Sequence, residues 1–374
     1  MDFLFQLILI LVFATVFGEL FQRLNQPSVV GEIVAGILLG IFLVPSESIK
    51  DMANLGILFL LFLAGTEIDI QDLIDVGRQS TSTAIFGMVL PFSIGFTTSY
   101  LIWKGVLLSL FIGTAFTATS IGVTVKTLMD MDKLDTIVGR TIIGSAIIDD
   151  ILGISLLGIV TSLSIGKVSV SKTFFSTLTG IFLIVVVLYI GIKTINSVAT
   201  HMNKLLLIEG SFMVFIILAL TLAYIAEKIG LNMVLGSFAA GIIIGKVVDH
   251  HLLGKISAMS RGFFIPIFFA FVGMSTHLGL SYQNLDIVFL FLVSASLSKV
   301  FGASIGSLIG GISPRESLVI GIGLMPRTEI ALAVITVGAG LGIIPPEIFS
   351  VLVITFALTV FITPMLLSLS YRNL

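Results

Sequence analysis

The run that decides the fold is Thr141-Ile-Ile-Gly-Ser-Ala-Ile-Ile-Asp149-Asp150-Ile-Leu-Gly-Ile-Ser-Leu-Leu-Gly-Ile-Val-Thr-Ser162. As a helix it is long enough to cross the roughly 30 Å of a bilayer's hydrocarbon core. Two carboxylates nevertheless stand side by side near its middle. A charge at the bilayer centre costs at least about 2.5 kcal/mol on insertion scales, so such residues are functional by default. The run therefore predicts a membrane span whose carboxylates take part in transport.

The composition agrees with a membrane protein. The 374 residues are 57% hydrophobic and only 11% charged, and the mean hydropathy is +1.19. A soluble domain would carry roughly a quarter of its residues as charges. The net charge of −2 argues against a nucleic-acid partner. Because the chain has no cysteine, disulfides, thiol catalysis and sulfur-ligated metals are excluded.

Apolar runs cover the whole chain and predict an all-α polytopic protein with about 13 transmembrane helices. The predicted spans are 3–22, 28–45, 54–74, 80–102, 106–128, 137–163, 174–198, 210–229, 231–247, 262–280, 286–310, 316–341 and 346–369. The N-terminus lacks the basic region of a secretory signal, so the first run is a retained span. No linker separates a soluble part, and we expect one membrane transporter domain over residues 1–374.

Loop charges predict the orientation. Twelve Lys and Arg residues fall on the side reached after the odd-numbered spans, and five fall on the other side. The positive-inside rule then places the N-terminus outside and the C-terminus in the cytoplasm.

The two halves of the chain resemble each other. The segment Pro27-Ser-Val-Val-Gly-Glu-Ile-Val-Ala-Gly-Ile-Leu-Leu-Gly40 matches Asn232-Met-Val-Leu-Gly-Ser-Phe-Ala-Ala-Gly-Ile-Ile-Ile-Gly245, with three glycines in register. Gly65 lines up with Gly273, and Ser109-Leu-Phe-Ile-Gly lines up with Ser317-Leu-Val-Ile-Gly, both at an offset of 208 residues. The matched spans are an odd number apart, so the repeats face opposite ways. We predict repeat one over 1–165, a linker helix over 166–205 and an inverted repeat two over 206–374.

Three more charges lie inside apolar runs. Lys299 is alone between Ile287 and Ser313, and Arg327 and Glu329 are alone between Ser317 and Pro346. With the two aspartates they carry a formal charge of −1, which suits a site that attracts a cation. An alternative is that they are structural ion pairs that tie the bundle together. One lysine can neutralise only one carboxylate, so the other needs a proton or a bound cation.

The helices near these charges are predicted to be broken. Thr114-Ala-Phe-Thr-Ala-Thr119-Ser120-Ile-Gly-Val-Thr124 is rich in β-branched and hydroxyl residues, and Pro326 interrupts the matching span. At the same offset Thr119 aligns with Arg327, and Ser120 aligns with Thr328. Paired interruptions at equivalent places indicate a mid-membrane site. Alternatively, the threonines simply bond back to their own helix.

These residues resemble the cation:proton antiporter-2 family, which contains the NapA-like sodium/proton antiporters with the NhaA-type fold and the Kef-type potassium transporters. The resemblance is carried by Thr117-Ala-Thr119-Ser120, Ile148-Asp149-Asp150, Pro266-Ile-Phe-Phe with Val272-Gly273-Met274, Lys299, and Met325-Pro326-Arg327-Thr328-Glu329. The resemblance implies inverted six-helix repeats with two crossing broken helices. It also implies a homodimer in the cell membrane of a prokaryote.

The resemblance also implies roles for single residues. Asp150 is expected to carry the cation and the proton, with Asp149 as its partner and Lys299 as the ion-pair mate of Asp149. Thr119 and Ser120 are expected beside the ion, and Arg327 and Glu329 are expected to compensate the broken helix ends. The family usually has glycine where this chain has Thr328. The chain as given lacks the nucleotide-binding domain of Kef-type members, which favours the sodium type.

We therefore expect a secondary transporter and no enzyme: a Na⁺/H⁺ antiporter that works by alternating access at the aspartate pair. We expect the exchange to be electrogenic and to need no cofactor. The only metal ion expected to bind Asp149 and Asp150 is the transported monovalent cation (Na⁺, Li⁺ or K⁺). The adjacent His250 and His251 are a weak metal signal. The alternatives are a K⁺/H⁺ antiporter of the same family, a sodium-coupled organic-anion symporter on the same fold, an ion channel and an intramembrane aspartyl protease. Such a protease needs aspartates on separate helices, whereas these two are neighbours about 100° apart on one helix.

Overall fold

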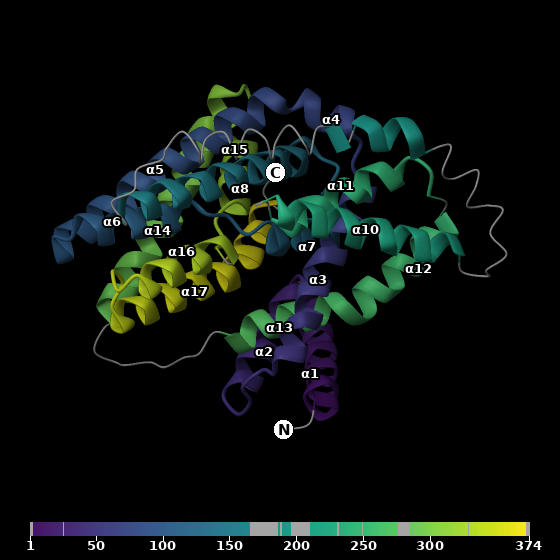
Figure 1. The fold of residues 1–374 in the computed structure, drawn as a ribbon, viewed down its shortest axis with the longest axis horizontal. Coiled ribbons are helices and arrows are strands. Elements are labelled where there is room, and N and C mark those ends of the chain that lie inside the picture. Colours follow the sequence, from purple (N-terminus) through teal and green to yellow (C-terminus); the bar gives the residue numbers. More distant parts are fainter. Residues whose placement is uncertain are drawn as a thin grey trace.

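The computed structural model describes residues 3–24, 26–164, 186–187, 189–195, 210–229, 232–248, 250–275, 285–327 and 329–371. None of these described residues lies in a strand, so the predicted all-α class is confirmed. The elements form two groups that lie side by side (Figure 1).

The first group is called the panel and lies at the bottom and right of Figure 1. It contains α1 (Phe3–Arg23), α2 (Ser28–Gly40), α3 (Glu47–Thr66), α10 (Gly210–Lys228), α11 (Met233–Gly245), α12 (His250–Met259), the π-helical turn η1 (Ser260–Phe264) and α13 (Ile265–Ser275). The short α4 (Ile70–Asp75) follows the panel helix α3.

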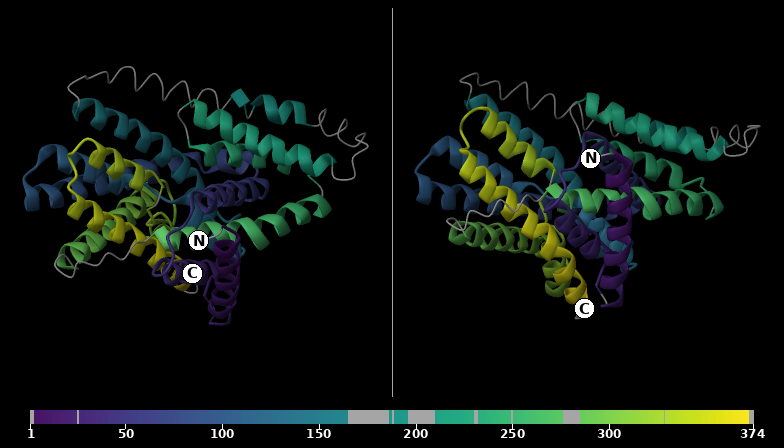
Figure 2. Two further views of the ribbon diagram at one scale, coloured as in Figure 1. Left: turned by 60° about the horizontal axis from the view of Figure 1, so that its bottom comes forward. Right: turned by 90° about the horizontal axis from the view of Figure 1, so that it is seen from below.

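The second group is called the core bundle. It contains α5 (Gly77–Trp103), α6 (Val106–Thr117), α7 (Ile121–Asp130), α8 (Ile137–Ser164), α14 (Leu285–Ile309), α15 (Pro314–Gly323), α16 (Glu329–Gly340) and α17 (Pro346–Tyr371). Its blue α5–α6 hairpin stays apart from the purple α1 of the panel in both views of Figure 2. In Figure 1, α7 lies between the two groups.

Glycines let the panel helices pack with their backbones in contact. A Cβ atom added at Gly36 of α2 would overlap the carbonyl oxygen of Ala270 of α13. One added at Gly273 of α13 would overlap the carbonyl oxygen of Ile33 of α2. In lipid, where apolar burial does not drive helices together, such close backbone approach supplies the packing energy.

Within the described residues, nine helices are long and apolar enough to span a membrane, counting α6 with α7 and α12 with η1 and α13. Three shorter apolar helices join them, at Ser28–Gly40, Met233–Gly245 and Ile330–Gly340. These helices fit a polytopic membrane protein. Most of the predicted span 174–198 and of the linker helix 166–205 lies outside the described residues.

Two predicted spans differ most from the observed helices. The predicted span 54–74 is α3, which begins at Glu47 and ends at Thr66, with α4 as a separate turn. The helical run predicted from 262 begins at His250. Both helices start with polar turns that hydropathy alone interprets as loop. In α12 the apolar face nevertheless buries Ile256.

The two predicted helix breaks are present. Ala118 and Ser120 have extended backbone angles between α6 and α7. A second break, containing Pro326, separates α15 from α16. Proline lacks an amide hydrogen and disfavours helical angles in the residue before it, which explains this second break.

Candidate functional site

The two helix breaks contact each other inside the molecule. The backbone N–H of Ser120 donates to the carbonyl oxygen of Pro326 at 2.7 Å. The hydroxyl of Thr124 donates to the carbonyl oxygen of Gly323 at 2.5 Å. Each break exposes polar backbone groups that its own helix no longer satisfies, and these bonds supply partners from the other break. The breaks thus bring residues about 200 positions apart in the chain into one buried site.

Arg327 holds this crossing together. It is completely buried, and its guanidinium donates to the carbonyl oxygens of Ala118 at 2.7 Å and Ala295 at 2.8 Å. It also lies over the ring of Phe116, 5.6 Å from the centroid. A cation at the end of α6 balances the negative end of that helix's dipole. The compensating role predicted for Arg327 stays a prediction. Thr328 and the side chain of Glu329 lie outside the described residues.

Asp149 and Lys299 form a buried ion pair. The Nζ of Lys299 lies 2.7 Å from Oδ2 of Asp149, and the two side chains are 0% and 1% exposed. The same Nζ donates to the carbonyl oxygen of Thr117 at 2.9 Å. The hydroxyl of Thr119 donates to Oδ2 of Asp149 at 2.8 Å. The predicted residues Thr119, Asp149 and Lys299 therefore lie together, at the break after α6.

Asp150 faces a different neighbour. Its side chain is buried at 3% exposed, and the amide nitrogen Nδ2 of Asn232 lies 3.5 Å from its Oδ2. Asn232 is the N-cap residue of α11 and belongs to the panel. The predicted carrier thus lies where the core bundle meets the panel. Ser120 is completely buried in the break after α6.

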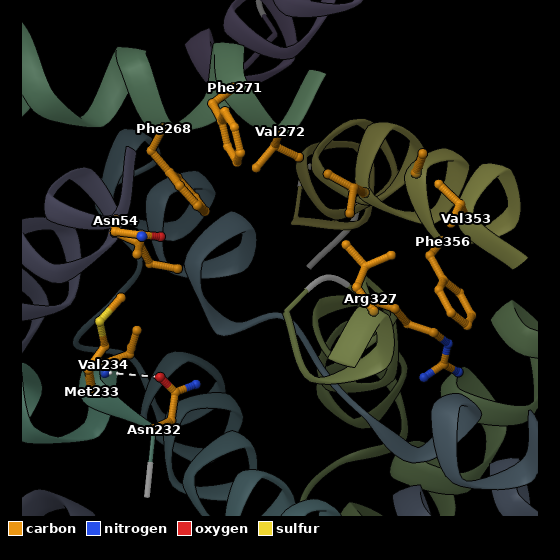
Figure 3. A pocket seen from close by; sticks show the side chains of 14 residues that line it. Asn54, Asn232, Met233, Val234, Phe268, Phe271, Val272, Arg327, Val353 and Phe356 are labelled. Atoms are coloured by element: carbon orange, nitrogen blue, oxygen red, sulfur yellow. Dashed lines mark hydrogen bonds between the residues drawn. The ribbon is translucent and has the colours of Figure 1, made fainter. Parts of the chain in front are cut away.

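A cavity of about 330 Å³ lies between parts of the panel and the core bundle (Figure 3). Panel residues from α3, α11 and α13 face residues of the second break, α16 and α17 across it. Three polar side chains line it, those of Asn54, Asn232 and Arg327, and the remaining described lining is apolar. Asn232 lines this cavity and also lies 3.5 Å from the carboxylate of Asp150.

The sequence interpretation missed a second buried polar cluster, where α2 meets α7. Lys126 lies near the end of the predicted span 106–128 and was counted only among the charges that set the orientation, but it is buried in α7 and its Nζ lies 2.6 Å from Oδ1 of Asp130. Ser28 of α2 accepts from Lys126 at 2.9 Å and donates to Asp130 at 2.9 Å. Glu32 of α2 is also buried. Because Glu32 is a charged residue inside the predicted span 28–45, it could have indicated this buried cluster from the sequence.

A resident metal has no recognisable ligand set in the described part of the chain. No group of three or more His, Cys, Asp and Glu side chains comes together there.

Comparison with known proteins places the chain among cation transporters. The family model "Sodium/hydrogen exchanger, transmembrane" matches residues 8–369. The chain is 31% identical over 376 residues to the Na⁺/H⁺-K⁺ antiporter GerN of Bacillus cereus, covering 99% of this chain and 96% of the relative. It is 32% identical to the probable Na⁺/H⁺ antiporter GerT of the same species, covering 98% and 99%.

A solved structure has a similar fold. The electron-microscopy structure of the sodium proton antiporter MjNhaP1 from Methanocaldococcus jannaschii matches with a TM-score of 0.74 at 19% identity, covering 99% of this chain and 97% of that one.

Proposed function

The chain belongs to the transmembrane sodium/hydrogen exchanger family, and from this premise we propose that Asp149 and Asp150 form the site at which it exchanges Na⁺ for H⁺. The chain is a secondary active antiporter rather than an enzyme, as its relatives' names indicate. The proposal concerns how the described residues perform that exchange.

The unequal surroundings of the two aspartates support the proposal most strongly. Asp149 already has a lysine partner at 2.7 Å and a threonine hydroxyl at 2.8 Å. Asp150 lies at the interface between core bundle and panel, and the panel meets it with the neutral amide of Asn232. A buried carboxylate is stable either with a proton on it or with a cation close by. Alternating between the two is the chemistry of an exchanger.

A dehydrated Na⁺ requires oxygen ligands, as hard cations do. The carboxylate of Asp150 can supply one, and the break after α6 offers the buried hydroxyl of Ser120 and carbonyl groups freed from helical bonding. Asp149 and Thr119, which share a hydrogen bond, complete the proposed ion-binding set. We assign Glu329 with Arg327 to the compensation of the broken helix ends.

We further propose that the chain is one transporter domain of two inverted repeats, 1–165 and 206–374, joined by the linker 166–205. Contacts in the panel support this. Gly36 of α2 lies against α13, and its repeat equivalent Gly241 of α11 lies against α3. Gly273 of α13 lies against α2, and its equivalent Gly65 of α3 lies against α11. Exchanging the two repeats turns the contact between α2 and α13 into the contact between α11 and α3. This is expected of thirteen helices arranged as two repeats about a pseudo-two-fold axis.

The finer assignment follows the sequence motifs. We propose a NapA-like, electrogenic antiporter of the cation:proton antiporter-2 type that forms a homodimer in a prokaryotic cell membrane. The N-terminus is proposed to lie outside and the C-terminus in the cytoplasm, because of the asymmetry of loop lysines and arginines. K⁺/H⁺ exchange is the second candidate, since the name of the relative GerN includes both cations.

The test is proton movement in sealed proteoliposomes, followed with a pH-sensitive dye after pulses of Na⁺, Li⁺ and K⁺. Wild type is compared with Asp150→Asn, in which an amide NH₂ group replaces one carboxylate oxygen. We expect Na⁺-evoked proton movement in wild type and none in the variant. No response of wild type to any of the three cations would refute cation/proton exchange. Full activity in the variant would refute the assignment of Asp150.

A further inference from the structure

We propose that Ser28 and Glu32 of the panel helix α2 and Lys126 and Asp130 of the core helix α7 form a latch, which closes the molecule at the end away from the cavity. The latch opens in each transport cycle, when the exchange site is reached from that end. This inference rests on the proposed exchange at the aspartate pair, which requires access from both sides of the membrane.

The hydroxyl of Ser28 connects the panel to the core bundle. It accepts from Nζ of Lys126 at 2.9 Å and donates to Oδ2 of Asp130 at 2.9 Å. Lys126 and Asp130 also pair with each other at 2.6 Å on their own helix, and their side chains are only 9% and 14% exposed. Hydrogen bonds to ionised groups are stronger than those between neutral groups. Two strong bonds, largely shielded from water, therefore hold α2 against α7.

Glu32 adds a charge to the panel side of this contact. It lies four residues after Ser28 and so on the same face of α2. Its side chain is buried at 6% exposed, and its charge is attracted by Lys126 and repelled by Asp130. Lys126 therefore attracts the panel through a carboxylate as well as through a hydroxyl.

Apolar side chains surround the latch on both helices. Val29 and Val30 of α2 and Val125 and Leu128 of α7 are completely buried. All four belong to one buried apolar cluster. A packed cluster of this kind excludes a hydrated ion while the latch is closed.

The cavity and the latch lie toward opposite ends of α17. Val353 and Phe356, in the first half of this helix, line the cavity. At its last residue, Oη of Tyr371 lies 3.3 Å from Oγ1 of Thr136, which follows the end of α7. From Phe356 to Tyr371 the helix rises roughly 22 Å, at about 1.5 Å per residue. The interface between panel and core bundle thus has space toward one end and a closed contact toward the other, as in one state of an alternating-access cycle.

A reversible cross-link tests whether the latch has to open. The chain has no cysteine, so Ser28→Cys with Asp130→Cys can be joined specifically by a short bis-methanethiosulfonate. Na⁺-evoked proton movement in proteoliposomes should fall at least about tenfold on cross-linking and return on reduction. Ser28→Cys with Glu32→Cys is the matched control, because its cross-link stays within α2, and it should transport equally before and after. Undiminished transport by the cross-linked latch pair would overturn the inference.

Cysteine labelling tests the latch without transport. The side chain of Val29 is buried in the closed state, so Val29→Cys reports opening through its reaction with a water-soluble maleimide. Adding Ser28→Ala should speed this labelling about two- to tenfold, the factor expected for one lost hydrogen bond. Ile10→Cys, buried within the panel, is the control and should label at an unchanged rate.

Unchanged labelling of Val29→Cys on adding Ser28→Ala, or an equal rise at Ile10→Cys, would also overturn the inference. Because labelling does not depend on transport, it decides about the latch even for a variant that transports poorly. Failure of wild type to exchange Na⁺ for H⁺ would instead refute the proposed function.

Discussion

Replacing Lys299 by methionine tests whether the buried ion pair is required for the fold. Methionine keeps most of the volume but leaves Asp149 without its charged partner, in a place where the two side chains are 0% and 1% exposed. Breaking a buried pair from one side costs about 3 to 5 kcal/mol, because a buried charge remains uncompensated. The carbonyl oxygen of Thr117 also loses a donor, since Lys299 bonds to it at 2.9 Å.

The assay is the thermal midpoint of the detergent-purified protein, read as the fraction that remains monodisperse after heating. A loss of this size should lower the midpoint on the order of 10 °C. Lys50→Met is the control, because Lys50 pairs with Glu47 at 3.4 Å with side chains 54% and 86% exposed. An exposed pair contributes about 0 to 1 kcal/mol, so the control should remain near wild type.

A double variant makes the reasoning refutable. Asp149→Asn with Lys299→Met removes both charges, and it should recover most of the stability lost in Lys299→Met alone. The reasoning fails if the thermal midpoint of Lys299→Met equals that of wild type. It also fails if the losses from the two single substitutions simply add, because the charges would then not interact.

Three further substitutions test other contacts through the same thermal midpoint. Arg327→Lys should cost about 1 to 3 kcal/mol, since one ammonium cannot reproduce the fork that reaches the carbonyls of Ala118 and Ala295; an unchanged midpoint would contradict this. Gly36→Ala should cost a similar amount, about 1 to 3 kcal/mol, because its Cβ would overlap Ala270, whereas Gly77→Ala, with open space around it, should not. Partial burial raises the pKa of the Glu67 carboxyl above its ordinary value of 4.5, despite the opposing Arg261. The folded state then holds this proton more tightly than the unfolded state, so stability declines as the pH rises above 4.5. Glu67→Gln should lose that decline, and parallel pH profiles of the variant and wild type would count against the burial effect.

Much of the site could be predicted because charges inside apolar runs are conspicuous. Asp149, Lys299 and Arg327 each interrupt a long apolar stretch, and the structure places them around the same break after α6. The break at Pro326 was predictable for a local reason, since proline cannot continue the hydrogen-bonding pattern.

Other features depend on contacts that local patterns do not encode. Asn232 begins a helix, where asparagine is common simply as a cap, and its approach to Asp150 joins residues 82 positions apart. Lys126 and Asp130 stand at the end of an apolar run, where charges are common, yet both bond to Ser28 of α2. The early start of α12 was hidden because its first turns are polar.

The difference between the two aspartates follows from where α6 ends. The carbonyl groups of Thr117 and Ala118 mark the negative end of that helix, and they receive Lys299 and Arg327 respectively. Both cations are therefore fixed by the break itself, and Lys299 brings Asp149 with it into a fixed pair. Asp150, one residue later on α8, lies beside the amide of Asn232, which belongs to the panel. The broken helix thus gives the two neighbouring carboxylates different surroundings, which supports the proposal that Asp149 and Asp150 act together at one exchange site.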